Sequence, residues 1–262
     1  MKIAKFFLGL ATGLRALAVA APTPDEVVPS LDTTLPLNKN SDLVDTNVTG
    51  YDPSYDYFDY STAQVWIGRT RKTVGWVIEG ELYRTVWGLL NHGCPDNSGD
   101  VRYRGFCHAP PGLSFPTKCL VNPPFGHGDC VTTIWDVYGQ WHNGEIRNLL
   151  IGAVAGTLEA LTTNQPIIGR SNCFSLGNRK ACNVGDIVRV NLPPIDGKKN
   201  FMHIRIDNRH SQYSDFHCCE SRPNVDRAID GLGSQLTTAF PQWWNRKFVR
   251  DTRCIIDGWK SC

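Results

Sequence analysis

The distribution of cysteines is the feature of this sequence that most restricts its fold. The chain of 262 residues contains ten cysteines, all of them after residue 93. An even number of cysteines gathered in one part of a chain is typical of a disulfide framework formed in an oxidising compartment. No CxxC spacing occurs, so the usual zinc-ribbon and thioredoxin-like signatures are missing. We expect five disulfides, in a pairing left open, among Cys94, Cys107, Cys119, Cys130, Cys173, Cys182, Cys218, Cys219, Cys254 and Cys262.

The first twenty residues have the pattern of a signal peptide. Lys2 and Lys5 precede an apolar run that ends in Ala18-Val19-Ala20. A charged start, an apolar centre and small residues before the cleavage site direct a chain to secretion. We therefore expect residues 1–20 to be removed and the protein to be extracellular, with an amphipathic N-terminal helix as the alternative. No later stretch reaches the ~18 uncharged apolar residues of a transmembrane helix, so no membrane span is expected.

Residues 21–60 form an acidic leader before a mildly basic body. They hold eight acidic residues, one lysine, no cysteine and no tryptophan. Such a composition buries too little apolar surface to offset chain entropy, which predicts a disordered pro-segment or linker. Asn47-Val48-Thr49 is an N-glycosylation sequon, so we expect a glycoprotein. The acidic, aromatic segment 51–60 (YDPSYDYFDY) is either an intramolecular cover for the basic domain or an ordinary tether.

Strand-like and helix-like patterns together predict one disulfide-stabilised α+β domain over residues 61–262. Short runs rich in Val, Ile, Trp and Tyr predict a small antiparallel meander at 64–69, 74–79 and 82–87. Two further strands are expected at 185–191 and 201–207. The proline- and cysteine-rich stretch 91–130 is expected to be loop.

Two helices are indicated by apolar residues at three- and four-residue steps. One covers 144–164, with Asn143 as its N-cap, and the other covers 223–240. The first is apolar on more than one face, so we place it centrally against the sheet. The expected fold is an antiparallel sheet with two packed helices.

The stretch FMHIRIDNRHSQYSDFHCCE (201–220) raises the question of a metal site, because His203, His210 and His217 are spaced seven apart. In a strand, Met202, Ile204 and Ile206 point inward, whereas Phe201, His203, Arg205 and Asp207 point the other way. The other two histidines then fall in a loop, so we expect no bound metal and no cofactor. Cys218 and Cys219 are expected to pair with two different partners.

A catalytic set is a second hypothesis. His142 and Glu145 lie at the predicted start of the first helix, and His203 and Arg205 lie on a strand. A base, an acid and a cation could together cleave a phosphodiester, which predicts a ribonuclease-like hydrolase. The alternative is that Glu145 caps the helix and His142 is a surface residue. The chain contains no GxSxG, HExxH or P-loop motif.

An aromatic and basic surface is a third hypothesis, since the chain has eight tryptophans. Trp243 and Trp244 beside Arg246 and Lys247 predict a surface for glycans, lipid or protein, against the alternative of core packing. The charge of the body is too diluted to indicate nucleic acid specifically.

The APTP sequence after the signal, the acidic cysteine-free leader and the cysteine-rich, tryptophan-containing body resemble fungal secreted cysteine-rich proteins, including candidate effectors and killer-toxin-like proteins. No functional residue is carried over. The resemblance implies an effector or toxin that binds an extracellular or host protein or glycan, with a role in virulence. A secreted hydrolase and a cell-wall-binding module are the alternatives.

Overall fold

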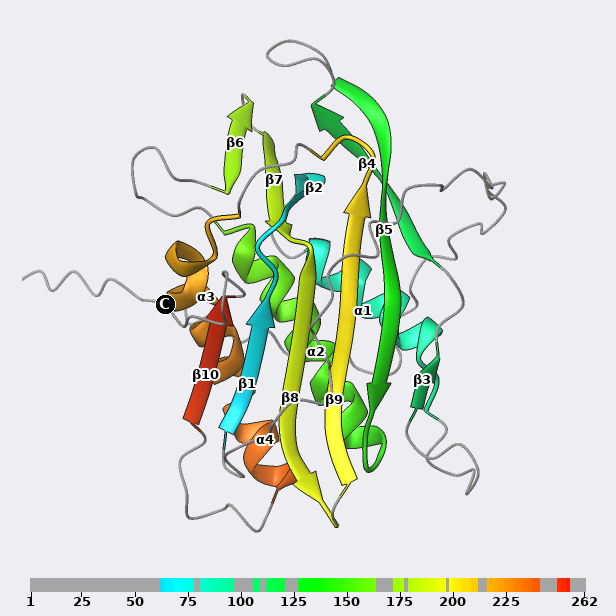
Figure 1. The fold of residues 1–262 in the computed structure, drawn as a ribbon, viewed down its shortest axis with the longest axis vertical. Coiled ribbons are helices and arrows are strands. Elements are labelled where there is room, and N and C mark those ends of the chain that lie inside the picture. Colours follow the sequence, from blue (N-terminus) through cyan, green and yellow to red (C-terminus); the bar gives the residue numbers. More distant parts are fainter. Residues whose placement is uncertain are drawn as a thin grey trace, which may run out of the picture.

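A computed structural model describes residues 62–77, 81–96, 106–108, 112–120, 127–163, 172–176, 179–196, 198–211, 216–240 and 249–254. The predictions for the signal peptide, the acidic leader and the sequon at Asn47 lie outside these residues. Within them, strands form one large and one small sheet, and four helices pack against the large sheet (Figure 1). The expected α+β class is therefore confirmed.

The main sheet has seven strands within the described residues, in the order β10-β1-β8-β9-β5-β3, with β4 paired to β5. All neighbours are antiparallel except β1 and β10, so the sheet is mixed and not antiparallel throughout. The strands are β1 (Thr62–Ile67), β3 (Phe106–His108), β4 (Leu113–Leu120), β5 (His127–Gln140), β8 (Ile187–Ile195), β9 (Lys198–Asn208) and β10 (Val249–Cys254). The small sheet contains β2 (Arg71–Val77), β7 (Arg179–Gly185) and β6 (Cys173–Leu176).

Helix α2 (Gly144–Leu161) is the centre of the fold. Thirteen of its eighteen residues are buried, and it contacts α1, α3, α4, β8 and β9. A helix that is apolar around most of its circumference lies largely inside the protein, and only a narrow stripe that includes Glu145 and Asn148 reaches the surface. The Asn143 side chain accepts a hydrogen bond from the backbone N–H of Ile146 at 2.9 Å. The predicted helix and its N-cap are both confirmed.

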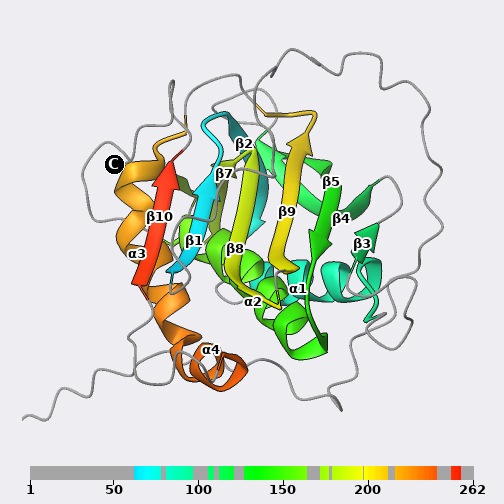
Figure 2. The ribbon, with the colours of Figure 1, turned by 60° about the horizontal axis from the view of Figure 1, so that its bottom comes forward.

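The other described helices surround α2 on the same side of the main sheet (Figure 2). They are α1 (Glu81–Gly93), α3 (Cys218–Gly231) and α4 (Gly233–Ala239). None of the helices in the described ranges is long and apolar enough to cross a membrane. The small sheet lies on this side as well, since Val74 of β2 lines the same interior region as Leu158 of α2 and Ile206 of β9. We call the opposite face of the main sheet the outer face.

Three predictions for residues 64–130 are wrong. Residues 82–87 belong to helix α1, because Leu82, Val86 and Leu90 recur at four-residue steps and are buried against α2. The meander is also wrong, since β1 joins the main sheet and β2 the small one. The stretch 91–130 is not only loop: β3, β4 and the start of β5 lie in it.

The second predicted helix is two helices with an earlier start. α3 begins at Cys218, and the chain breaks at Leu232 between Gly231 and Gly233 before α4. The two glycines weaken helix continuity, and this accounts for the break. The double cysteine therefore stands in the first turn of a helix and not at the end of a loop.

Buried disulfides join neighbouring elements of the fold. Four are described: Cys94–Cys107, Cys119–Cys130, Cys173–Cys182 and Cys218–Cys254. Cys218 links α3 to β10, and Cys219 is also oxidised, so the neighbouring cysteines do not pair with each other. Several disulfides indicate folding in an oxidising environment.

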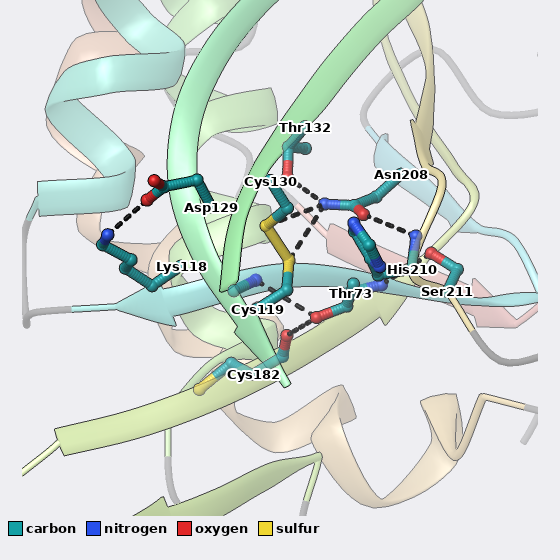
Figure 3. Close-up of a disulfide and its surroundings, with 11 residues drawn as sticks. Thr73, Lys118, Cys119, Asp129, Cys130, Thr132, Cys182, Asn208, His210 and Ser211 are labelled. Atoms are coloured by element: carbon teal, nitrogen blue, oxygen red, sulfur yellow. Dashed lines mark hydrogen bonds and ion pairs between the residues drawn. A yellow bond between two sulfur atoms is a disulfide. The ribbon is translucent and has the colours of Figure 1, made fainter. Parts of the chain in front are cut away.

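One disulfide supports the turn after β9 (Figure 3). Asn208 at the end of β9 is buried, and its amide nitrogen donates to Thr132 Oγ1 at 2.9 Å beside the Cys119–Cys130 bridge. Its Oδ1 accepts from the His210 backbone N–H at 2.9 Å. His210 therefore lies in a turn that is held beside the Cys119–Cys130 disulfide.

Candidate functional site

A single cross-strand row of basic and aromatic side chains crosses the outer face. Arg253 on β10 pairs with Trp66 on β1, Trp66 with Arg189 on β8, Arg189 with His203 on β9, and His203 with Tyr138 on β5. Their chain neighbours Val65, Val188, Val190, Met202 and Ile204 lie in the core on the opposite side. Because side chains alternate across a strand, this outer row faces away from all four described helices.

Arginine side chains stack on aromatic rings in and around the row. The Arg189 guanidinium lies 4.5 Å from the Phe201 ring centre, Arg205 lies 4.7 Å from Trp135, and Arg253 lies 5.0 Å from Trp66. Each distance is within the range of a cation–π interaction. These stacks hold the guanidinium planes in place on the outer face.

Two of the most polar members of the row are almost fully buried. Arg189 and His203 are each 2% exposed. Arg189 Nε donates to Asn191 Oδ1 at 2.8 Å, and Asn191 Nδ2 donates to Gln64 Oε1 at 3.3 Å. This buried polar chain links β8 to β1 on the outer face, and polar groups this deeply buried need such partners.

Burial and neighbouring charge keep His203 neutral. Desolvation, followed by the positive charges of Arg189 and Arg205, lowers the pKa of His203 from 6.5 to about 3. Its Nε2 lies 3.7 Å from a carboxylate oxygen of Asp136, which is beyond hydrogen-bond length. The imidazole stacks on the Tyr138 ring at 4.7 Å. The histidine therefore acts at neutral pH as an uncharged, aromatic member of the row.

A β-bulge places Asp136 beside the row. Between the pairs Trp135–Arg205 and Tyr138–His203, strand β5 has one residue more than β9. Asp136 adopts a positive φ of 50° there, a conformation that is uncommon outside glycine but tolerated by aspartate. Bulges recur beside functional sites because they re-aim a side chain. This one brings a half-exposed carboxylate to the β5 end of the row.

The structure brings together only part of the predicted catalytic set. His203 and Arg205 share the outer face of β9. His142 and Glu145 stand at the start of α2, on the helix side, with Glu145 exposed. The His142 backbone N–H donates to Asn200 Oδ1 at 2.7 Å. This hydrogen bond holds His142 in place between the end of β5 and the start of α2.

The spaced histidines are also separated. His203 is buried, whereas His210 and His217 are exposed in the turn after β9 and just before α3. In the parts of the chain that the structure describes, no cluster of three or more His, Cys, Asp or Glu side chains could hold a metal ion. The predicted binding residues Trp243, Trp244, Arg246 and Lys247 lie outside the described residues.

Sequence reasoning missed most of the outer row. The alternation in GDIVRVN, with Val188 and Val190 inward, was enough to place Arg189 and Asn191 outward. The same reasoning applied to 64–69 would have placed Trp66 on the same side. Tyr138 could not be found this way, because the bulge shifts the alternation of β5 by one residue.

No family model matches the chain, and no curated protein or solved structure matches it significantly. The site therefore has to be interpreted from its own geometry.

Proposed function

We propose that this protein is secreted and acts as an effector or toxin-like protein, by binding a host or competitor target through the outer face of its main sheet. The observation that carries the proposal is the outer row, a line of guanidinium and aromatic groups that crosses five strands. Arginine and aromatic residues are the side chains most enriched at the energetic centres of protein interfaces. Arg189, His203 and Trp66 are buried within the row, so a partner would contact its half-buried members Arg253 and Tyr138 and the neighbouring Arg205.

The chemistry of His203 favours binding over catalysis. A general acid or base works best with a pKa near the working pH, and the pKa of His203 is lowered to about 3. At neutral pH it is an uncharged imidazole without the acidic imidazolium proton, and the lowered pKa makes it a weak base. Tyr138, its stacking partner, is half-buried and lies against the ring, not in line with a nitrogen that could activate it.

The charge pattern suits a protein segment with acidic and aromatic side chains. Guanidinium groups bind carboxylates through paired N–H donors, and they stack on rings at the same time. The outer face also carries the carboxylates of Asp136, Asp207 and Asp251; Asp207 is paired with Lys72 and Asp251 with Arg253, which lowers the net positive charge that the face could offer to a nucleic-acid backbone. A target with spaced acids between aromatic residues meets the cations without this repulsion.

Secretion is supported by the signal-like N-terminus and by the disulfides. The bridges form and persist in oxidising compartments such as the extracellular space, and the first twenty residues have the composition of an export signal.

Cell challenge with matched variants tests the proposal. The purified protein would be applied to plant and fungal cells, and death or growth arrest measured. Arg205→Gln/Arg253→Gln removes two stacked cations from the outer face. Arg84→Gln/Arg227→Gln removes two exposed cations from α1 and α3 as the control. We expect the first variant to lose activity and the second to keep it. Equal activity of both would remove the outer face as the binding surface.

Two alternatives have their own tests. A ribonuclease that uses His142, Glu145 and His203 requires RNA cleavage by the wild-type protein and its loss in folded His142→Ala/Glu145→Ala. A carbohydrate- or wall-binding module that uses Trp243 and Trp244 requires binding to an insoluble glycan. Full cell activity of the His142→Ala/Glu145→Ala variant would favour recognition over catalysis.

A further inference from the structure

We propose that the outer face is the docking surface for an acidic, tyrosine-rich peptide, and that segment 51–60 of this chain occupies it in the full-length protein. The inference deepens the proposed function, because it names the ligand chemistry of the same face. It rests on the burial of the outer row, on the chemistry of the segment and on the place where the chain enters the sheet.

The burial of the row is unexplained by the described layers. Arg189 and His203 are each 2% exposed, and Trp66 is 9% exposed. The four described helices and the small sheet all pack on the opposite face of the main sheet (Figures 1 and 2). A side chain on one open face of a sheet normally keeps contact with water. Among the described residues, no second layer covers this face to account for the low exposure.

Segment 51–60 matches the surface chemically. It contains four tyrosines, one phenylalanine and three aspartates in ten residues. Its rings can stack on Trp66 and on the guanidinium planes, and its carboxylates can accept hydrogen bonds from Arg189 and Arg205. No other stretch of the acidic leader contains an aromatic residue, so this segment alone carries both features.

The carboxylates already on the face limit where the segment can lie. Asp136 stands at the β5 end of the row, Asp251 accepts hydrogen bonds from Arg253 at the β10 end, and Asp207 of β9 is paired with Lys72 at 2.7 Å. Asp251 already matches the charge of Arg253, and Asp136 repels acidic groups at the β5 end. We therefore place the aspartates of the segment over β8 and β9, where Arg189 and Arg205 lie, with tyrosines toward Trp66.

The chain enters the sheet next to this surface. β1 begins at Thr62, directly after the segment, and carries Trp66 of the outer row. Ten extended residues span about 33 Å, whereas the outer strands of a five-strand row are separated by about 19 Å. The segment can thus turn back from β1 and cross the whole row without a long connection, which makes its effective concentration at the face high.

Hydroxyl-radical footprinting of the full-length secreted chain tests the proposal, with intact mass used to check that the leader is retained. The readouts are the oxidation rates of Trp66 and Phe201, and Trp141, 1% exposed in the core, is the internal control. Changing Tyr51, Tyr55, Tyr57 and Tyr60 to Ser should raise oxidation of Trp66 and Phe201 several-fold and leave Trp141 unchanged. The same four tyrosines changed to Phe should keep the protection.

A control variant changes the leader elsewhere. Val27→Ser, Val28→Ser, Leu31→Ser and Leu35→Ser also remove four apolar side chains, and this variant should keep Trp66 protected. All of these changes lie outside the described fold, so a misfolded body does not confuse the result.

Two results would overturn the inference: wild-type Trp66 that is already reactive, or protection that the Tyr→Ser variant retains. Protection of Trp66 in a chain that has lost its leader during secretion would overturn it as well. Because footprinting needs no target, a negative result would disprove the docking of segment 51–60 alone. The cell assay would still test the proposed function separately.

Discussion

Arg189 on β8 and His203 on β9 lie directly opposite each other in the antiparallel ladder, and each is 2% exposed. Burial disfavours the charged form of the imidazole, and the neighbouring positive charges of Arg189 and Arg205 add to this effect, so the pKa of His203 is lowered to about 3. The position of His203 in the sheet thereby makes acid sensitivity a property of the outer face.

The first prediction follows from that protonation state. The pKa of His203 is about 3 in the folded protein against an ordinary value of 6.5, so as the pH falls this side chain is protonated in the unfolded chain before it is protonated in the folded protein. The contribution of neutral His203 to the unfolding free energy is complete above pH 6.5 and is lost as the pH falls from 6.5 toward 3. The free energy of unfolding should fall by up to about 1.4 kcal/mol per pH unit in this window. Urea unfolding at several pH values measures the slope.

His203→Gln provides the comparison, because glutamine has no titratable group. The difference in unfolding free energy between wild type and variant should shrink or reverse as the pH falls below 6.5. Burial raises the pKa of Asp186, which has the opposite sign, and this contribution cancels in the difference. A difference that is flat between pH 7 and pH 4 would show that His203 titrates normally and that the outer face is open to water.

The sequence predicted an element correctly where a single periodic pattern of apolar residues ran through it. The four-residue steps of Leu150, Val154 and Leu158 defined α2 and its burial, and the alternation of Met202, Ile204 and Ile206 defined the two faces of β9. The α+β class and the oxidised cysteines followed from composition and count.

The errors arose where local preference and tertiary packing disagreed. Tyr83, Val86 and Trp87 favour strands by propensity, yet they belong to α1, since α2 offers an apolar surface to a helix. Pro116 suggested loop, yet it lies in β4. Among the described strands β4 pairs with β5 and no other, and proline is tolerated on an edge strand. The outer row could not be predicted as a unit, because its residues lie on five strands whose order in the sheet the sequence does not reveal.

A second prediction compares two disulfides by the length of chain that each closes. Cys218–Cys254 spans 36 residues and Cys173–Cys182 spans 9. In the chain-entropy view, their removal costs about 4 and about 2.5 kcal/mol of unfolding free energy. Replacing each pair by serine and measuring denaturant unfolding gives the two costs.

Local hydrogen exchange distinguishes the structural roles of these two bridges. Loss of Cys218–Cys254 should raise exchange in β10, which pairs only with β1 among the described strands. Loss of Cys173–Cys182 should raise exchange in β6 and β7. If both losses cost the same and neither is local, the bridges do not act through the segments that they join.

A third prediction concerns the start of α2. Asn143→Ala removes the acceptor for the Ile146 N–H and should cost about 1 kcal/mol of unfolding free energy. Asn143→Ser keeps an oxygen in the same place and should recover most of the loss. Thermal unfolding of the two variants beside wild type measures the difference. Equal loss in both would mean that packing around Asn143, and not the cap, stabilises the junction.

The last prediction concerns Arg147, a buried cation that joins two helices. Its Nε donates to the backbone oxygen of Cys94 at 2.5 Å, and its Nη2 donates to the backbone oxygen of Asn91 at 2.6 Å and to its side-chain oxygen at 2.8 Å. The last carbonyls of a helix have no partner within that helix, so this one guanidinium closes the end of α1 onto α2. Desolvation lowers the pKa of Arg147 from its ordinary value, but arginine remains charged at any working pH.

Arg147→Met keeps most of the apolar stem and leaves the carbonyls buried without donors, which should cost about 2–3 kcal/mol of unfolding free energy. Arg147→Lys, which supplies a charge but not the planar pair of donors, should recover only part of this free energy. Denaturant unfolding measures both variants. A methionine variant as stable as wild type would show that water satisfies these carbonyls and that the α1–α2 contact depends on apolar packing alone.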